Sequence, residues 1–299
     1  MNTDTDTAHV TELYVAHSTD DMPDKLFHLI HQSLLNALQD SSEFYIALSG
    51  GSLPSLLTFL PQSFETANID PQWVKWRVIL ADERLVPSSH PDSNLKSLKE
   101  CFLDKVPIPA DKIYGIDESL LPNENSWLEI AEEYQHRVFS SSVSVGDRRK
   151  GFLLDCVLLG FGPDGHTASL FPNHELLQDE SGKLVLGIMD SPKPPPQRIT
   201  LSMYCLNQMS RNVIFVGAGE SKEQILSDIF LTVHQEEAMM CDTEHHGKVK
   251  KYVVTMKDVS HQKYPCGMIR PKDRRLVYIT DESGARDLVT DQHCFSSLL

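Results

Sequence analysis

Residues 151–172 read GFLLDCVLLGFGPDGHTASLFP. The first ten residues are almost continuously apolar, which is the pattern of a strand buried on both faces of a parallel sheet. The glycine-rich residues that follow would leave this strand at its carboxyl end, where open parallel sheets bind their ligands. The stretch therefore predicts both the kind of sheet and the edge at which a functional site should lie.

Short apolar runs alternate with amphipathic stretches along the rest of the chain. This alternation predicts a doubly wound, mostly parallel α/β sheet with helices on both faces, a Rossmann-like arrangement. Because no linker composition or internal repeat divides the sequence, we expect residues 1–299 to form a single domain. The expected strands are 12–18, 44–49, 74–83, 151–160, 212–218 and 275–280, and the expected helices are 23–39, 53–60, 92–106, 125–142, 220–230 and 281–289.

Residues 232–264 depart from this pattern because they are strongly polar, and we expect a surface insertion there. A solvated loop is the interpretation that we favour over a metal site, because the spacing fits no metal-site template. We expect no metal and no cofactor. The candidate ligands in this segment are His234, Cys241, His245, His246 and His261.

The net charge of −15 bears on the possible partners. An acidic surface repels nucleic acid and anionic membranes, so we expect neither as a partner. A phosphorylated substrate would need a local nest of backbone N–H groups and a few cations. The polar N-terminus, the unpaired pattern of the six cysteines and the lack of an apolar run of about 18 residues predict a cytoplasmic protein.

The segment LSGGSLP, residues 48–54, follows a predicted strand and precedes a predicted helix. Two glycines allow a tight turn and a close approach to a ligand. Ser49, Gly50, Gly51 and Ser52 could thus form a phosphate cradle with the start of the helix. The alternative is an ordinary turn between a strand and a helix.

The segment ADERLVP, residues 81–87, places three charges at the end of another predicted strand. Such a run is usually a solvated turn. Its position nevertheless makes Asp82 and Arg84 candidates for a site at the carboxyl edge of the sheet.

Gly160, Gly162 and Gly165 match the G-x-G-x-x-G pattern of a dinucleotide loop, but their surroundings argue against that function. Pro163 removes a backbone N–H, and Asp164 would place a negative charge beside phosphates. The same loop carries His166, a side chain suited to proton transfer near neutral pH, and Asp164 could orient its ring. The alternative is a histidine with a structural hydrogen bond.

Two cations complete the candidate set. Three prolines would hold residues 194–196 extended and present Arg198 at the start of a strand, where a guanidinium can bind phosphate. Lys222 would stand in the first turn of a helix, where a bound anion would offset its conflict with the helix dipole. Either residue could instead be an ordinary surface cation.

The ordered set of motifs resembles the 6-phosphogluconolactonase family, in its eukaryotic cytosolic form, within the glucosamine-6-phosphate isomerase/6-phosphogluconolactonase superfamily. The resemblance extends over residues 12–290. It implies hydrolysis of 6-phospho-D-glucono-1,5-lactone to 6-phosphogluconate, an α/β fold and a monomer, and it does not imply NAD. The motifs are SGGS, DERLVP, LGFGPDGHTASLFPNH, PPPQRIT and GAGESK.

We interpret His166 as the general base for attack of water on C1, with Asp164 as its orienting group. Arg84 is the candidate for the developing oxyanion. The remaining candidates are assigned to the substrate phosphate, namely Ser49, Gly50, Gly51, Ser52, Arg198 and Lys222.

Two other functions are compatible with these residues. A deaminase or isomerase on the same fold could use Asp82 to move a proton at C2, but related deaminases resemble D-G-H-I-A-F-N-E-P where this chain has DGHTASLFP. A sugar-phosphate sensor could keep the pocket without catalysis. Substitution of His166 distinguishes the sensor from the lactonase.

Overall fold

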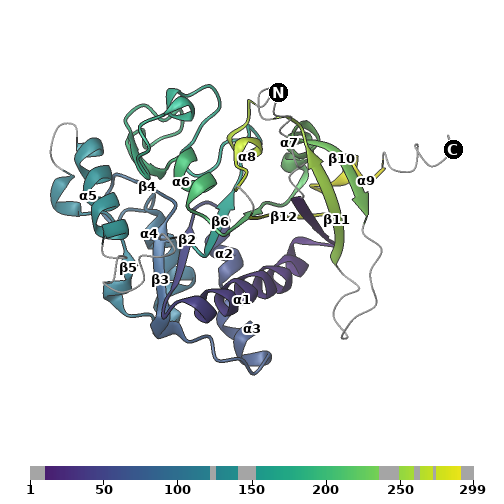
Figure 1. Ribbon diagram of the computed structural model, residues 1–299, viewed down its shortest axis with the longest axis horizontal. Helices are drawn as coiled ribbons and strands as arrows, with labels where there is room; N and C mark the ends of the chain where they lie inside the picture. The colour runs from purple at the N-terminus through teal and green to yellow at the C-terminus, as the bar shows by residue number, and fades with distance from the viewer. Residues whose placement is uncertain are drawn as a thin grey trace, which may run out of the picture.

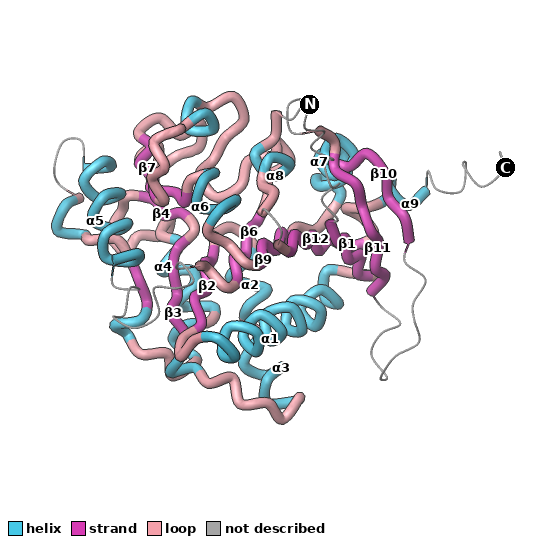
Figure 2. The backbone as a smooth tube through the Cα atoms, in the orientation of Figure 1, coloured by secondary structure: helices cyan, strands magenta, loops and turns pink. Residues whose placement is uncertain are grey.

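Nine strands form one sheet in the computed structural model, within the described residues 11–121, 126–140, 153–235, 249–258, 263–271 and 274–290. Their order is β10-β11-β1-β12-β9-β6-β2-β3-β5 (Figures 1 and 2). The strands are β1 (Thr11–Ala16), β2 (Phe44–Leu48), β3 (Trp76–Leu80), β5 (Ile113–Tyr114), β6 (Cys156–Gly160), β9 (Asn212–Val216), β10 (Phe230–Gln235), β11 (Val249–Met256) and β12 (Arg275–Asp281).

From β1 through β12, β9, β6, β2 and β3 to β5, every neighbouring pair is parallel. The predicted mostly parallel sheet is therefore confirmed. The apolar run that led to this prediction forms β6, and Cys156–Leu159 are completely buried. Burial of both faces explains why the run shows no alternation of polar and apolar residues.

Helices lie on both sides of this sheet. Figure 1 shows α1 and α3 below the sheet and α7 and α8 above it. The helices are α1 (Met22–Asp40), α2 (Leu53–Leu57), α3 (Leu60–Thr66), α4 (Asn94–Cys101), α5 (Ser126–Ser140), α6 (Met203–Gln208), α7 (Glu223–Ile229), α8 (Pro265–Met268) and α9 (Arg286–Thr290).

The segment predicted as one helix at 53–60 is divided in two. The first helix, α2, ends at Leu57, and α3 begins at Leu60 with Pro61 in its first turn. Proline disrupts a helix interior but fits the first turn, because the N–H that it lacks would have no partner there.

The insertion predicted at 232–264 is not simply a loop. Its described parts contribute to two antiparallel strands, since β10 pairs with β11 and β11 pairs with β1 at the edge of the sheet. Tyr252, Val254 and Met256 are buried there, so the prediction of a solvated loop is wrong for this part. Cys241, His245, His246 and His261 lie outside the described residues.

A second sheet of three short antiparallel strands was not predicted. It has the order β4-β8-β7, with β4 (Asp82–Arg84), β7 (Val185–Ile188) and β8 (Arg198–Leu201). Strand β4 follows β3 almost directly, so this sheet begins at the carboxyl edge of the large one. In its register Arg84 lies opposite Arg198.

The carboxyl ends of β2, β6 and β9 point the same way because these strands are adjacent and parallel. Ser49 follows β2, Gly160 ends β6, and Gly217 follows β9. Predicted site segments that are far apart in the sequence are thereby brought to one edge of the sheet. In the described part of the chain, no helix is both long enough and apolar enough to cross a membrane.

Candidate active site

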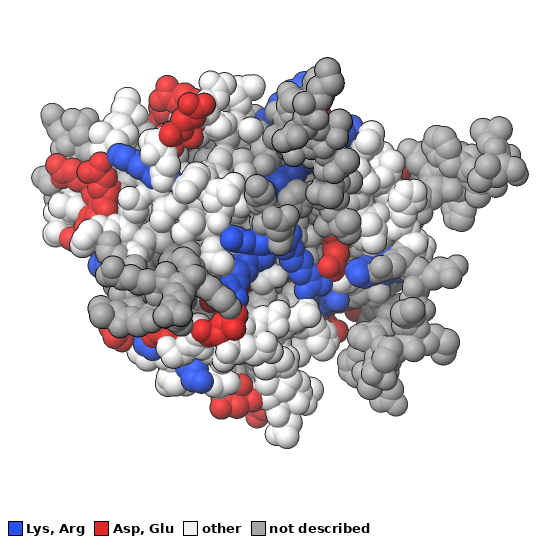
Figure 3. Space-filling view, in the orientation of Figure 1, with Lys and Arg blue, Asp and Glu red and all other residues white. Residues whose placement is uncertain are grey.

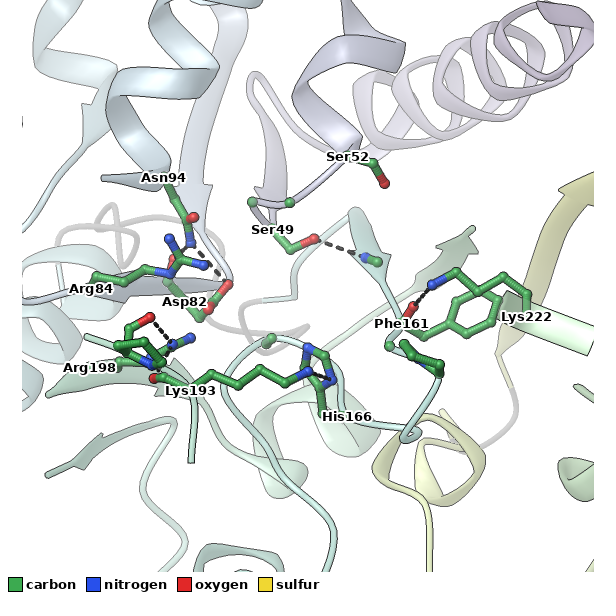
Figure 4. A pocket seen from close by; sticks show the side chains of 17 residues that line it. Ser49, Ser52, Asp82, Arg84, Asn94, Phe161, His166, Lys193, Arg198 and Lys222 are labelled. Atoms are coloured by element: carbon green, nitrogen blue, oxygen red, sulfur yellow. Dashed lines mark hydrogen bonds between the residues drawn. The ribbon is translucent and has the colours of Figure 1, made fainter. Parts of the chain in front are cut away.

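A cavity of about 410 Å³ lies at this edge (Figure 4). Nine of the ten catalytic and phosphate-binding candidates from the sequence analysis line it, and the tenth, Asp164, contacts the ring of His166. The nine are Ser49, Gly50, Gly51, Ser52, Asp82, Arg84, His166, Arg198 and Lys222.

His166 and Asp164 form a hydrogen-bonded pair between Nδ1 of the ring and Oδ1 of the carboxylate. The loop closes tightly around them, because the N–H of Gly162 donates to the carbonyl of His166 at 2.9 Å. A Cβ on residue 162 would stand 2.1 Å from Nδ1 and 2.3 Å from Oδ1. Glycine at this position therefore makes room for the pair rather than for a pyrophosphate.

The environment of the pair sets its protonation. Burial lowers the pKa of His166 below its ordinary value of 6.5; Asp164 opposes this shift, and the ammonium of Lys193 adds to it. Burial alone would raise the pKa of Asp164, but hydrogen bonds with His166 and Lys193 lower it to about 2. Near pH 7 the pair is thus a neutral imidazole beside a carboxylate, a state that can accept a proton.

Phe171 packs against one face of the His166 ring. Its ring is buried and stacks on the His166 ring, with the centroids 5.1 Å apart and the planes at 17°. The guanidinium carbon of Arg198 lies 5.7 Å from the same phenyl ring. One aromatic side chain therefore contacts both the imidazole of His166 and the guanidinium of Arg198 and helps to hold them in place.

Arg84 and Arg198 face each other across β4 and β8. Like charges in directly opposite positions destabilise a strand pair, so this arrangement favours an anion between them. Burial, and next the charge of Arg84, lower the pKa of Arg198. Nη1 of Arg84 donates to the carbonyl of Asp92 at 2.7 Å, whereas its Nε is buried and has no acceptor among the described residues.

Arg198 is held more firmly than the sequence indicated. Its Nε donates to the carbonyl of Pro195 at 2.9 Å, and its Nη2 donates to the carbonyl of Lys193 at 2.6 Å. The prediction that Arg198 begins a strand is confirmed. The guanidinium fixes the proline-rich segment as well as lining the cavity.

Asp82 is buried and committed to two donors. Ser169 Oγ donates to Oδ2 at 2.8 Å, and Asn94 Nδ2 lies 3.3 Å from Oδ1. Asn94 also donates to the Asp82 carbonyl at 2.9 Å, which joins the start of α4 to β4. A Cβ at Gly50 would stand 1.9 Å from Oδ1 of Asn94, so this glycine is required by close packing.

The 49–52 loop and the 160–169 loop are joined directly. The N–H of Gly160 donates to Oγ of Ser49 at 2.9 Å. Ser52, at the start of α2, makes no capping hydrogen bond with its hydroxyl and is exposed at the cavity. Helix α2 has only five residues, so few peptide dipoles add up at its end.

Lys222 stands just before α7, at the end of a 3₁₀ turn formed by Glu220–Lys222. Its Nζ donates to the carbonyl of Phe161 at 2.7 Å and lies 5.3 Å from the centre of the Phe161 ring. Burial, and next the charge of Lys193, lower the pKa of Lys222. The side chain thus faces the cavity from the side opposite to Arg84 (Figure 4).

The lining of the cavity is rich in positive charge, in contrast to the net negative charge of the chain. Figure 3 shows Lys and Arg side chains gathered around the hollow at the centre of this face, although the chain has a net charge of −15. The cations that line the cavity are Arg84, Lys193, Arg198 and Lys222. This concentration of positive charge fits an anionic ligand.

Sequence reasoning missed Asn94 and Lys193. Lys193 stands immediately before the three prolines that position Arg198, which is the signal that could have indicated it. Asn94 begins α4, next to the capping residue Ser93, and only the tertiary fold brings it to Gly50. Among the described residues, no group of three or more His, Cys, Asp or Glu side chains is arranged to hold a metal ion.

Comparison with known proteins identifies the family of the chain. The family model for glucosamine-6-phosphate isomerases/6-phosphogluconolactonase matches residues 17–278. The chain is 36% identical to the 6-phosphogluconolactonase of Rattus norvegicus over 275 residues, 91% of each chain, and 33% identical to that of Homo sapiens over 258 residues, 86% of this chain and 85% of the human one.

A solved structure shows the same fold. The 6-phosphogluconolactonase of Trypanosoma cruzi superposes with a TM-score of 0.69 at 22% identity, covering 94% of this chain and 98% of its own. The sequence relatives and the family model together establish the relationship. The chain belongs to the glucosamine-6-phosphate isomerase/6-phosphogluconolactonase family.

Proposed function

We propose that the protein hydrolyses 6-phospho-D-glucono-1,5-lactone to 6-phospho-D-gluconate, the second step of the oxidative pentose phosphate pathway, with His166 as the general base. One observation carries the proposal: the hydrogen-bonded His166–Asp164 pair faces a cavity lined by cations in an otherwise acidic chain. The names of the rat and human relatives support the same substrate.

The reaction needs no redox step, because a lactone is an internal ester. In the proposed step, His166 takes a proton from water while the hydroxide adds to C1 of the lactone. Collapse of the tetrahedral intermediate breaks the bond from C1 to the ring oxygen, and the ring oxygen receives the proton from His166. A general base of this kind typically contributes about 10²–10⁴-fold in rate.

Arg84 is the proposed donor to the oxyanion. Arg84 lines the cavity, and among the described residues its guanidinium donates only to the carbonyl of Asp92, so it keeps donors free for a ligand. A donor that is already aimed at the developing charge needs no reorganisation during the reaction.

The phosphate is proposed to bind to the 49–52 loop together with Arg198 and Lys222. These groups line the same cavity as His166, so the phosphate would anchor the sugar with C1 near the base. Binding energy from a remote, unreacting group can position the reacting atoms in this way.

The proposal is tested by following freshly made lactone by NMR with the wild type, with His166→Asn and without protein. The protein-free sample is needed because the lactone also hydrolyses spontaneously. His174→Asn is the matched control, since His174 also pairs with a carboxylate, Asp190 at 3.0 Å, but does not line the cavity.

Rapid loss with the wild type and with His174→Asn, and loss near background with His166→Asn, is the expected result. Equal acceleration by His166→Asn would remove His166 as the base and leave Asp82 or Asp164. Background rates in all samples would overturn the lactonase proposal.

A further inference from the structure

Nδ1 of His166 lies within hydrogen-bond distance of two groups that make opposite demands. The Asp164 carboxylate can only accept a hydrogen bond, whereas the Lys193 ammonium, 2.9 Å away, can only donate one. In a neutral imidazole, Nδ1 carries either a proton or a lone pair. It can therefore satisfy Asp164 or Lys193, but not both at once.

The choice decides whether His166 can act as a base. If Nδ1 carries the proton and donates to Asp164, the lone pair is on Nε2. If Nδ1 accepts from Lys193, the proton is on Nε2, which then has no lone pair to receive a proton from water.

Lys193 is anchored at its backbone, whereas its side chain is partly exposed. Its carbonyl accepts from Arg198 Nη2 at 2.6 Å and from Ser191 Oγ at 2.9 Å. Its side chain is 44% exposed, and its Nζ also lies 3.1 Å from Oδ2 of Asp164. A rotation of this flexible side chain can take the ammonium from His166 into the cavity without moving the main chain.

We propose that Lys193 is a positioning residue that couples phosphate binding in the cavity to the tautomer of His166. Without phosphate, its ammonium donates to Nδ1 and holds the proton on Nε2. A bound phosphate is the stronger partner and draws the ammonium away. Nε2 then releases its proton to water, Nδ1 takes one from water, and Asp164 accepts the new N–H. The catalytic meaning of this switch rests on the proposed function.

The other groups around the ring favour this switch. The charges that act on His166 are Asp164 on its own loop, Lys193 from the segment after β7, and Asp82 from β4, while Phe171 covers one face of the ring. Lys193 is the cation of this set. Once it has moved away, the remaining charges of this set are carboxylates, and Asp164, which is bonded to Nδ1, favours a protonated Nδ1.

The test reads the tautomer directly. Long-range ¹H–¹⁵N correlation spectra of protein with ¹⁵N-labelled histidine distinguish a protonated ring nitrogen from an unprotonated one. They would be recorded at about pH 8, where the ring is neutral, with His166→Gln to assign the signals. The probe is inorganic phosphate, with sulfate-free buffer and added chloride as the ionic-strength control.

Lys193→Met is the decisive variant and Lys183→Met its matched control. Both lysines flank β7, both contact a carboxylate, and their exposures are 44% and 43%, but Lys183 pairs with Glu132 and does not line the cavity. We expect Lys193→Met to carry the proton on Nδ1 without phosphate. We expect the wild type and Lys183→Met to carry it on Nε2 and to change to Nδ1 with phosphate.

The same tautomer in the wild type and in Lys193→Met without phosphate would overturn the proposal. A wild-type ring that stays unchanged while ³¹P NMR shows phosphate bound would overturn it too. These measurements need no turnover, so their result is independent of whether the lactone is the substrate.

Kinetics add a second readout. Lys193→Met should raise KM about tenfold through the lost charge-assisted contact while changing kcat less. It should also move the rising limb of the pH profile to higher pH, because loss of a nearby cation raises the pKa of His166. A lysine with only a structural role would leave the midpoint of that limb unchanged.

Discussion

Two glycine-rich loops enter the cavity from neighbouring parallel strands, the 49–52 loop after β2 and the 160–169 loop after β6. In the first, Gly50 makes room for a side chain from another element, Asn94 of α4. In the second, Gly162 makes room for two side chains of its own loop, His166 and Asp164. The first loop therefore joins parts of the fold, whereas the second shapes a local proton-transfer pair.

The difference shows that a glycine pattern has to be interpreted with its neighbours. In the G-x-G-x-x-G match of the 160–169 loop, Gly162 makes space for an imidazole, whereas Gly165 has φ +79° and lies against Tyr264. Substitutions in the two loops should accordingly affect different quantities, kcat in one and KM and stability in the other.

The largest effect is expected from Gly162→Ala. The new methyl group would stand 2.1 Å from Nδ1 of His166, so the ring must leave its place. Because a misplacement of about 1 Å can cost about 100-fold in rate, kcat/KM for the lactone should fall by about 100-fold. Thermal unfolding followed on the same sample should show a folded protein. Wild-type activity would remove the distinction between the loops.

Asp164→Asn should lower kcat/KM by about tenfold or more. The loss should not exceed the whole contribution of a general base, which is about 10²–10⁴-fold. Activity should rise with pH through the pKa of His166, which lies below 6.5 in the wild type. Since Asp164 raises that pKa, its loss should move the rising limb to lower pH. The pH profile of kcat/KM measures both effects.

Asp190→Asn is the control for this variant, because Asp190 pairs with His174 away from the cavity. Its pH profile should match that of the wild type. A shift to higher pH in Asp164→Asn would contradict the role given to the carboxylate.

Gly50→Ala should act through Asn94 instead of His166. Its methyl group would overlap the Asn94 amide, which also holds Asp82. We expect a loss of about 1–3 kcal/mol of stability and a higher KM with a smaller change in kcat. Denaturant unfolding and steady-state kinetics measure these quantities.

The double variant Gly50→Ala/Asn94→Ala sharpens this comparison, because truncation of Asn94 restores the space. The two substitutions should then be non-additive, as expected for residues in contact. An equal cost of Gly50→Ala in both backgrounds would show that Asn94 is not the cause.

The smallest effect is expected from Gly182→Ala, outside both loops. Gly182 has φ +72°, and among the described residues no atom lies within 4 Å of a new Cβ, so only backbone strain changes. A cost of about 1 kcal/mol should lower Tm by about 2 °C and leave kcat/KM unchanged. A drop in activity would mean that glycine strain alone can mimic the loop effects.

The large sheet could be predicted from the sequence because its central strands are buried on both faces. Runs such as β2 and β6 are apolar throughout and carry no competing signal. The small sheet could not be predicted, because β4 has three residues, all charged, and β7 and β8 have four each. Strands β10 and β11 were missed because β10 is the edge strand and β11 is its neighbour, and both carry polar, exposed or half-buried residues.

The candidate site could be predicted where polar or charged side chains lie at the end of a strand or in the loop that follows it. Ser49, Asp82 and His166 belong to segments at strand ends, and the parallel sheet brings such ends together. Lys193 and Asn94 reach the cavity from a connecting segment and from the start of a helix. The prolines after Lys193 are a local signal for it, but the position of Asn94 depends on tertiary contacts that no local pattern records.

Strand β1 can complete its pairing only late in synthesis, because both of its neighbours come from the far end of the sequence. Thr11–Ala16 lie between β11 and β12, so this strand pairs with residues 249–254 and 276–281, which are made more than two hundred residues later. Until then both edges of β1 are open, and open strand edges recruit other chains. A nascent chain that stalls before Val249 lacks both β11 and β12. It would therefore expose β1 as an unpaired strand.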